Sequence, residues 1–111
     1  MATKKFRDQL TNEIIELERE TKSLKFVMIR SGDYFDGKNH DYYYFGDDNG
    51  NRYNYDSPVD SNGNALTQLG KVLAYRERDN CTCIISGYFS KDSHLENSYY
   101  IHNPRLIKVQ D

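Results

Sequence analysis

The sequence contains no tryptophan, only two cysteines and no long hydrophobic run. A membrane-spanning helix needs about 20 predominantly apolar residues, and no segment approaches that length. The opening residues MATKKFRDQL also lack the apolar stretch of a secretory signal. A chain of 111 residues is long enough for one domain with one modest core. We therefore expect residues 1–111 to form a single soluble, cytoplasmic domain with no membrane partner.

The few cysteines and the balanced charge disfavour two further classes of protein. Cys81 and Cys83 are separated by one residue, a spacing that suits disulfide geometry poorly, and three scattered histidines do not complete a zinc site. We expect both thiols to be reduced and packed as small apolar groups, with no metal and no cofactor. The net charge of -2 disfavours a strongly basic nucleic-acid-binding protein, although a local basic patch remains compatible with it.

Compact catalytic signatures are also absent from the sequence. It has no glycine-rich phosphate loop, no nucleophile elbow and no His-Glu-x-x-His motif. Asp47, Asn49 and Asn51 alternate as in a calcium loop, but Pro58 stands where the closing glutamate is required. His40, His94 and His102 stand beside Asn, Asp, Ser or Leu, and none shows a local pairing with a nucleophile, so a structural role is expected for each. We therefore expect a protein that is not an enzyme.

The N-terminal segment shows a helical periodicity. Apolar or β-branched residues recur there at steps of three and four: Phe6, Leu10, Ile14, Leu17, Thr21 and Leu24. This spacing places them on one stripe of a helix, with Thr3 as a candidate N-cap. The pattern predicts an amphipathic helix over residues 4–24 whose stripe packs on a sheet.

Most of the remaining chain alternates as strands do. Residues 25–31 have a period of two, with Phe26, Met28 and Arg30 on one face, and residues 81–89 are rich in β-branched and aromatic types. Residues 32–39 read as a loop containing Tyr34 and Phe35.

Two later segments depart from simple alternation. Residues 64–78 fit either a helix with the stripe Leu66, Leu69, Val72, Leu73 and Arg76 or one arm of a hairpin turning at Asp79 and Asn80. In the last strand Pro104 cannot donate to a neighbouring strand, so we expect it at an edge or a bulge.

The clearest local signal is a hairpin around Asp47-Asp48-Asn49-Gly50. A three-residue loop with Gly50 in the left-handed conformation puts Asp47 opposite Asn51, and then Phe45 faces Tyr53 and Tyr43 faces Tyr55. A two-residue turn would shift this register by one. We favour the first register because it sorts the aromatic residues to one face. The opposite face then carries Tyr42, Tyr44, Arg52 and Asn54.

Together these segments predict an α+β fold, in which the N-terminal helix packs on a curved antiparallel sheet of about five strands. The order of the hairpin YYYFGDDNGNRYNY, then LGKVLAY, CIISGYF and YYIHNPRLIKV, resembles an OB-fold module over about residues 25–109. In outline it is similar to small single-strand-binding proteins of phages and other mobile elements. That resemblance implies a curved, OB-like sheet that binds a nucleic acid or docks another protein.

Tyrosine is the residue that suggests a function. Ten tyrosines exceed what a small core uses, because each buried hydroxyl needs a partner. Aromatic side chains alternating with cations on strands can stack bases and neutralise phosphates. The candidate binding residues are Tyr42, Tyr44, Arg52, Asn54, Tyr75, Arg76, Arg78 and Lys91.

These residues are compatible with three interpretations. We expect a non-catalytic protein that is accessory to a nucleic-acid machine and binds single-stranded nucleic acid or a replication protein. The alternative is a small phage or mobile-element inhibitor or adaptor that binds a larger replication or defence protein. The plainest interpretation is that the tyrosines only cover the sheet.

Overall fold

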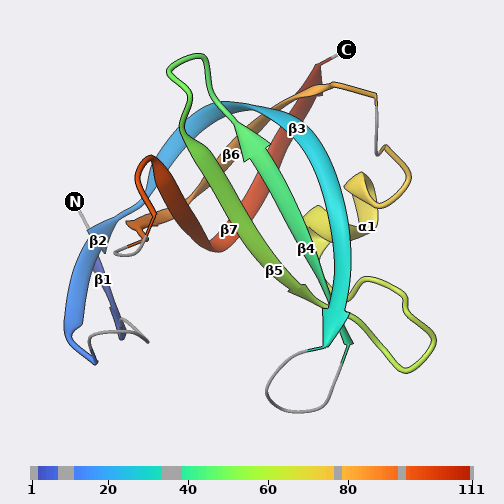
Figure 1. Ribbon diagram of the computed structural model, residues 1–111, viewed down its shortest axis with the longest axis horizontal. Coiled ribbons are helices and arrows are strands. Elements are labelled where there is room, and N and C mark those ends of the chain that lie inside the picture. The colour runs from blue at the N-terminus through green and yellow to red at the C-terminus, as the bar shows by residue number, and fades with distance from the viewer. Residues whose placement is uncertain (1–2, 8–11, 34–38, 77–78, 93–94, 111) are drawn as a thin grey trace.

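The computed structural model describes residues 3–7, 12–33, 39–76, 79–92 and 95–110. In chain order the elements are β1 (Thr3–Arg7), β2 (Ile14–Glu18), β3 (Glu20–Asp33), β4 (Asn39–Gly46), β5 (Arg52–Pro58), α1 (Gln68–Leu73), β6 (Thr82–Lys91) and β7 (Ser98–Gln110) (Figure 1). No helix in the described part of the chain has the length and apolar character needed to cross a membrane.

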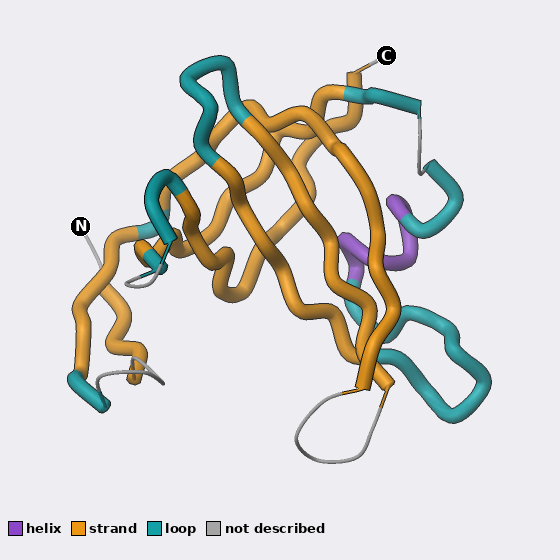
Figure 2. Tube along the Cα trace, in the orientation of Figure 1, coloured by secondary structure: helices purple, strands orange, loops and turns teal. Residues whose placement is uncertain are grey.

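Five strands form a closed barrel with the order β3-β4-β5-β7-β6 (Figure 2). The ring closes because β3 is long: its first half pairs with β6 and its second half pairs with β4. The junction between β5 and β7 is parallel and covers three residue pairs, from Arg52 opposite Ser98 to Asn54 opposite Tyr100. β1 and β2 form a separate two-stranded hairpin.

Alternate residues of the strands fill the barrel. The buried core consists of Leu24, Phe26, Tyr43, Phe45, Tyr53, Leu69, Leu73, Cys81, Cys83, Ile85, Phe89, Ile101 and Leu106. Successive strand side chains point to opposite faces, so the residues between them lie on the outside of the barrel. The described core is therefore aromatic on β4 and β5, mixed on β3 and β6, and aliphatic on β7 and α1.

The predicted α+β fold with an N-terminal helix is wrong. The molecule is mostly β: residues 4–24 supply β1, β2 and the start of β3, and the only helix among the described residues is α1. In a helix Leu24 and Phe26 would point to opposite sides, whereas in β3 both point into the core. Ile14 of the predicted stripe is 62% exposed, and Leu10 lies outside the described residues. The sheet is also mixed, since β5 and β7 run parallel.

The predicted hairpin register is confirmed. Phe45 lies opposite Tyr53 and Tyr43 opposite Tyr55, with all four rings on the core side. The Asp47 N–H donates to the Asn51 carbonyl across a three-residue loop. Local turn chemistry therefore determines which side chains of β4 and β5 face outward.

This turn belongs to a sequence pattern, Asp-x-Asn-Gly-Asn, that occurs at residues 47–51 and again at residues 60–64. In each turn one carboxylate oxygen of the Asp accepts from the backbone N–H groups two and four residues later. The other oxygen accepts from the side-chain amide of the last Asn. Gly50 and Gly63 have φ values of 82° and 83°, which glycine adopts without strain. Turn formation thus explains the acidic residues that resemble a calcium loop.

The Asp47 carboxylate has one further partner, the Tyr53 hydroxyl at 2.9 Å. Burial alone would raise the pKa of Asp47, but the hydrogen bonds from Asn51, Tyr53 and Asn49 outweigh it and hold the pKa below its usual value. Burial and the Asp47 carboxylate raise the pKa of Tyr53. The hairpin turn is therefore tied to the barrel core.

The structure resolves the two alternatives for residues 64–78 in favour of a short helix, so the second hairpin is wrong. Thr67 caps α1 by accepting from the Gly70 N–H at 3.1 Å. A side chain at Gly70 would come within 2.9 Å of the Ala65 Cβ and of the Ser57 Oγ. Glycine is needed there because the helix lies directly against β5.

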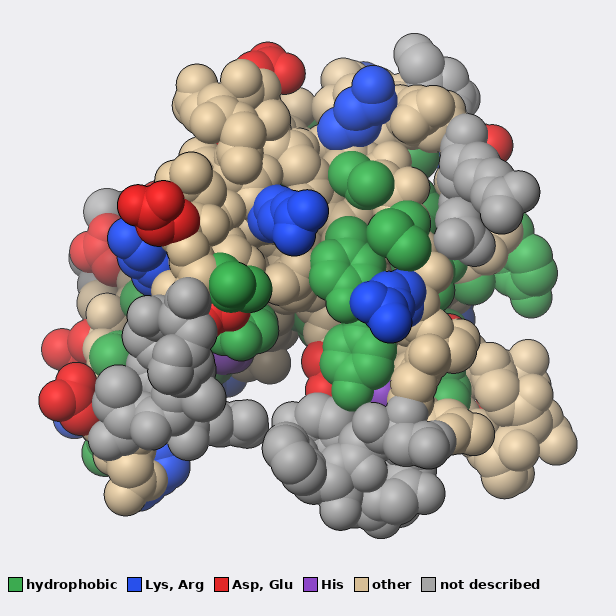
Figure 3. Space-filling view, viewed as in Figure 1, with side chains coloured by type: hydrophobic (Ala, Val, Ile, Leu, Met, Phe, Trp, Pro, Cys, Tyr) green, Lys and Arg blue, Asp and Glu red, His purple; other side chains and the backbone are tan. Residues whose placement is uncertain are grey.

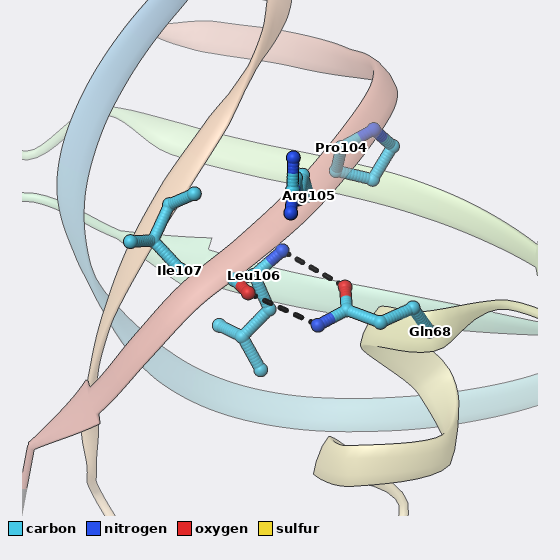
Figure 4. Close-up of a pocket in the computed structure, with 5 residues that line it drawn as sticks. All are labelled: Gln68, Pro104, Arg105, Leu106 and Ile107. Carbon is cyan, nitrogen blue, oxygen red and sulfur yellow. Dashed lines mark hydrogen bonds between the residues drawn. The ribbon is translucent and has the colours of Figure 1, made fainter.

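Gln68 joins α1 to β7. Its side-chain amide donates to the Leu106 carbonyl and accepts from the Leu106 N–H, both at 3.0 Å (Figure 4). Beyond Tyr100 the described strands pair with β7 on its β6 side only. The Gln68 amide therefore takes the place of a neighbouring strand at an otherwise open edge. The next part of that edge is interrupted by Pro104, which lies in an irregularity of the β6–β7 pairing, as predicted.

The N-terminal hairpin packs on the outside of β6 and β7. The Phe6 ring lies 4.6 Å from the His102 ring and 5.2 Å from the Tyr88 ring. Arg19, between β2 and β3, donates to the Ser86 carbonyl and hydroxyl and to the Asn103 carbonyl. This part of the outer barrel surface is therefore covered.

The two cysteines are buried free thiols with their sulfur atoms 3.9 Å apart, as predicted. Burial and the neighbouring Cys81 raise the pKa of Cys83 to about 12. A thiol with such a pKa is protonated and unreactive at neutral pH.

Candidate functional site

The candidate site is the outer surface of β3, β4 and β5, which we call the outer face. Cα pairing places its residues in three rows across the strands. These rows are Lys25–Gly46–Arg52, Met28–Tyr44–Asn54–Tyr100 and Arg30–Tyr42–Asp56. The predicted grouping of Tyr42, Tyr44, Arg52 and Asn54 on one face is confirmed, with Arg52 exposed and the other three half-buried.

A bulge at Val27 adds apolar and basic side chains from β3. The pairing with β4 skips this residue, so Phe26 points into the core while Met28 and Arg30 both point outward. Val27 and Met28 are 50% and 40% exposed. The prediction that Phe26, Met28 and Arg30 share a face is therefore wrong. Strict alternation cannot reveal a bulge, and sequence reasoning missed Met28 and Arg30 for that reason; Lys25, which precedes the bulge, was also missed.

Charge is distributed unevenly over the outer face. Figure 3 shows hydrophobic side chains gathered over β3 and β4, with Lys and Arg side chains beside them. Lys25 and Arg52 lie in the row nearest the β4–β5 turn. At the opposite end, His40 Nδ1 lies 2.7 Å from the Asp56 carboxylate. The outer face therefore has two cations near the turn, while at its other end Arg30 and His40 lie with Asp56, and the tyrosines lie between.

Asn54 lies in the middle row, directly opposite Tyr44 on one side and Tyr100 on the other. Its Nδ2 donates to the Ser98 hydroxyl over a long 3.5 Å, and its Oδ1 is buried without a hydrogen-bond partner. The Tyr100 hydroxyl donates to Asp92 at 3.0 Å. A polar side chain thus lies between two tyrosines, of which Tyr100 was not predicted as a site residue.

The other predicted site residues do not join the outer face. Tyr75 is 87% exposed and follows α1, and Arg76 next to it forms an ion pair with Asp79 at 3.4 Å. Lys91 pairs with Tyr99, whose ring stacks on Tyr53, so Lys91 lies at the end of the barrel. Three predicted residues, Arg78 of the site and Tyr34 and Phe35 of the aromatic loop, lie outside the described residues.

Within the described ranges, no three His, Cys, Asp or Glu side chains are grouped so that they could hold a metal ion. Stacking, ionic contacts and hydrogen bonding are the chemistry that the outer face offers. Comparison with known proteins adds no assignment: no family model matches the chain, and searches of curated proteins and of solved structures find no match.

Proposed function

We propose that this chain is a non-catalytic protein that binds single-stranded nucleic acid through its outer face, as an accessory to a nucleic-acid machine such as a replication complex. One observation carries the proposal: Tyr42 and Tyr44 point outward from the same strand, with cations in the rows on either side. Aromatic rings that face outward beside cations are a common means of binding single-stranded nucleic acid, because the bases stack on the rings and the cations meet phosphates.

The spacing of the two tyrosines suits consecutive bases. Residues two apart on a strand are separated by roughly 6.6 Å along it, so two bases of one strand can each stack on one ring. Each such stack is worth about 1–3 kcal/mol. Arg52 and Lys25 on one side of the two rings, and Arg30 beside Tyr42, can then meet phosphates.

The arrangement of the barrel supports this proposal. A five-stranded barrel resembles the OB-fold, in which the surface of the second and third strands binds oligonucleotides. β4 and β5 are the second and third strands of this barrel, and they carry Tyr42, Tyr44, Arg52 and Asn54.

The test is fluorescence anisotropy of a labelled single-stranded oligonucleotide at low salt. We expect the double variant Tyr44→Ala/Arg52→Ala to lose at least about tenfold in affinity, because it removes one stack and one ionic contact. The matched control is Tyr75→Ala/Lys108→Ala, which removes an exposed tyrosine and an exposed cation elsewhere. Unchanged affinity in the first variant, or an equal loss in the control, contradicts the proposal.

A second candidate function is that of an inhibitor or adaptor that binds another protein. Exposed Val27 and Met28 favour it, because apolar side chains add little to phosphate binding but are typical of protein interfaces. A pull-down with and without nuclease separates the two functions. A partner protein that survives nuclease and is lost with Met28→Asp indicates the second function.

A further inference from the structure

Asn54 differs from the rest of the outer face in its hydrogen bonding. Among the described outer-face side chains it alone has a buried polar atom, Oδ1, without a partner. Buried polar atoms are nearly always hydrogen-bonded, so an exception needs an explanation. Ligand recognition is one such explanation when the atom lies on a candidate binding surface.

The Ser98 hydroxyl can donate or accept, and in this structure it accepts from the Asn54 amide. In the orientation that the structure shows, Nδ2 faces the Ser98 hydroxyl and Oδ1 has no donor within hydrogen-bonding distance. This orientation leaves Oδ1 as an acceptor that a ligand donor can satisfy.

The neighbours of Asn54 define what could satisfy it. Tyr44 and Tyr100 lie directly opposite on the two adjacent strands, so the amide lies between two rings on the outer surface. Rings on both sides favour a flat aromatic ligand, and a purine offers the larger stacking area.

Hydrogen bonding then selects between the two purines. An asparagine amide pairs with adenine through two bonds, accepting from N6 and donating to N7. At the same edge guanine presents two acceptors, N7 and O6, so Asn54 Oδ1 would face a like group. We infer that Asn54 selects the base at the centre of the outer face and that this base is adenine. The inference rests on the proposed binding of single-stranded nucleic acid.

Binding must include a small rearrangement. Asn54 Oδ1 is covered in the free protein, so a base reaches it only after a neighbouring side chain changes rotamer. Rotamer changes of this kind are common at binding interfaces, where the backbone hardly moves.

The experiment compares labelled hexamers of deoxyadenosine, deoxycytidine and deoxythymidine by anisotropy. The variants are Asn54→Leu, which keeps the branched shape and removes the amide, and Asn54→Ala, which tests the same point if the larger Leu does not fit. Asn62→Ala, in an exposed turn, is the matched control. Circular dichroism and thermal melting establish that each variant is folded.

We expect wild type to bind the adenine hexamer at least about fivefold more tightly than the thymine hexamer, which is the low end of discrimination by a two-bond pair. The folded Asn54 variant should bind the thymine hexamer within about twofold of wild type and lose the preference. If wild type shows no adenine preference, or if the preference persists in that variant, the role of Asn54 is overturned and the proposed function is not. Failure of wild type to bind any hexamer overturns the proposed function as well.

Discussion

The substitution Gly70→Ala tests how closely α1 packs against β5. The change in stability expected from that packing is opposite to the change expected from helix propensity. Replacing an interior helical glycine with alanine ordinarily stabilises a helix by about 1 kcal/mol. At Gly70, however, the new Cβ would lie 2.9 Å from the Ala65 Cβ, 2.9 Å from the Ser57 Oγ and 3.0 Å from the Thr67 Oγ1. Ser57 is completely buried, so the neighbours have little room to move.

Overpacking of this kind costs about 1–3 kcal/mol. From the middle of that range, about 2 kcal/mol, the propensity gain of about 1 kcal/mol is subtracted, so Gly70→Ala should lower the free energy of unfolding by about 1 kcal/mol. In a domain of this size that corresponds to a fall in Tm of about 4–8 °C. Thermal melting followed by circular dichroism measures it.

Gly46→Ala is the control for this substitution. Its Cβ would meet its nearest neighbour, the Asn51 carbonyl oxygen, at an ordinary 3.7 Å. We expect that variant to melt within a degree or two of wild type or slightly higher, because alanine restricts the unfolded chain. A Tm of Gly70→Ala equal to or above that of wild type would refute the packing of α1 against β5.

Three further predictions concern the fold. Gln68→Ala should lower the free energy of unfolding by about 1–3 kcal/mol in urea denaturation, because it removes both hydrogen bonds to Leu106. A change below about 0.5 kcal/mol contradicts a stabilising role for these two hydrogen bonds. The folded-state pKa of Asp47 is lowered, so its stabilisation is complete above the unfolded pKa and is lost as pH falls. Asp47→Asn should therefore flatten the dependence of Tm on pH between about pH 5 and pH 2, and an unchanged profile argues against this network. Cys81 and Cys83 should not react with a thiol reagent at pH 8 until the protein is unfolded, and rapid labelling of the native protein contradicts their burial.

The parts of the structure that sequence predicted correctly are those determined by local chemistry. The Asp-x-Asn-Gly-Asn turn fixed the register of β4 against β5, and that register placed Tyr42, Tyr44 and Arg52 on one surface. All the atoms that make this turn lie within a few residues of one another. This five-residue pattern is therefore sufficient to predict the conformation of the turn.

The N-terminal prediction failed because the deciding contacts are distant in sequence. Residues 20–25 become a strand by pairing with residues 82–87. The sequence of neither segment predicts that it pairs with the other. Leu24 fits a helical stripe and a strand face equally well, and the burial of Phe26 two residues later decides for the strand. At the site, the bulge at Val27 exchanges the faces of Met28 and Arg30. An added residue in a strand is a property of the pairing, which alternation alone does not show.

The most direct test of the proposed function is the salt dependence of oligonucleotide binding by wild type and by Arg52→Ala. With two or three phosphate contacts, the logarithm of the association constant should fall against the logarithm of salt concentration with a slope of about -1.4 to -2.1. Loss of the Arg52 contact should make that slope shallower by about 0.7, since each contact to a single strand contributes that amount. Absence of binding by wild type at low salt, or an identical slope for the two proteins, contradicts the assignment of the outer face to single-stranded nucleic acid.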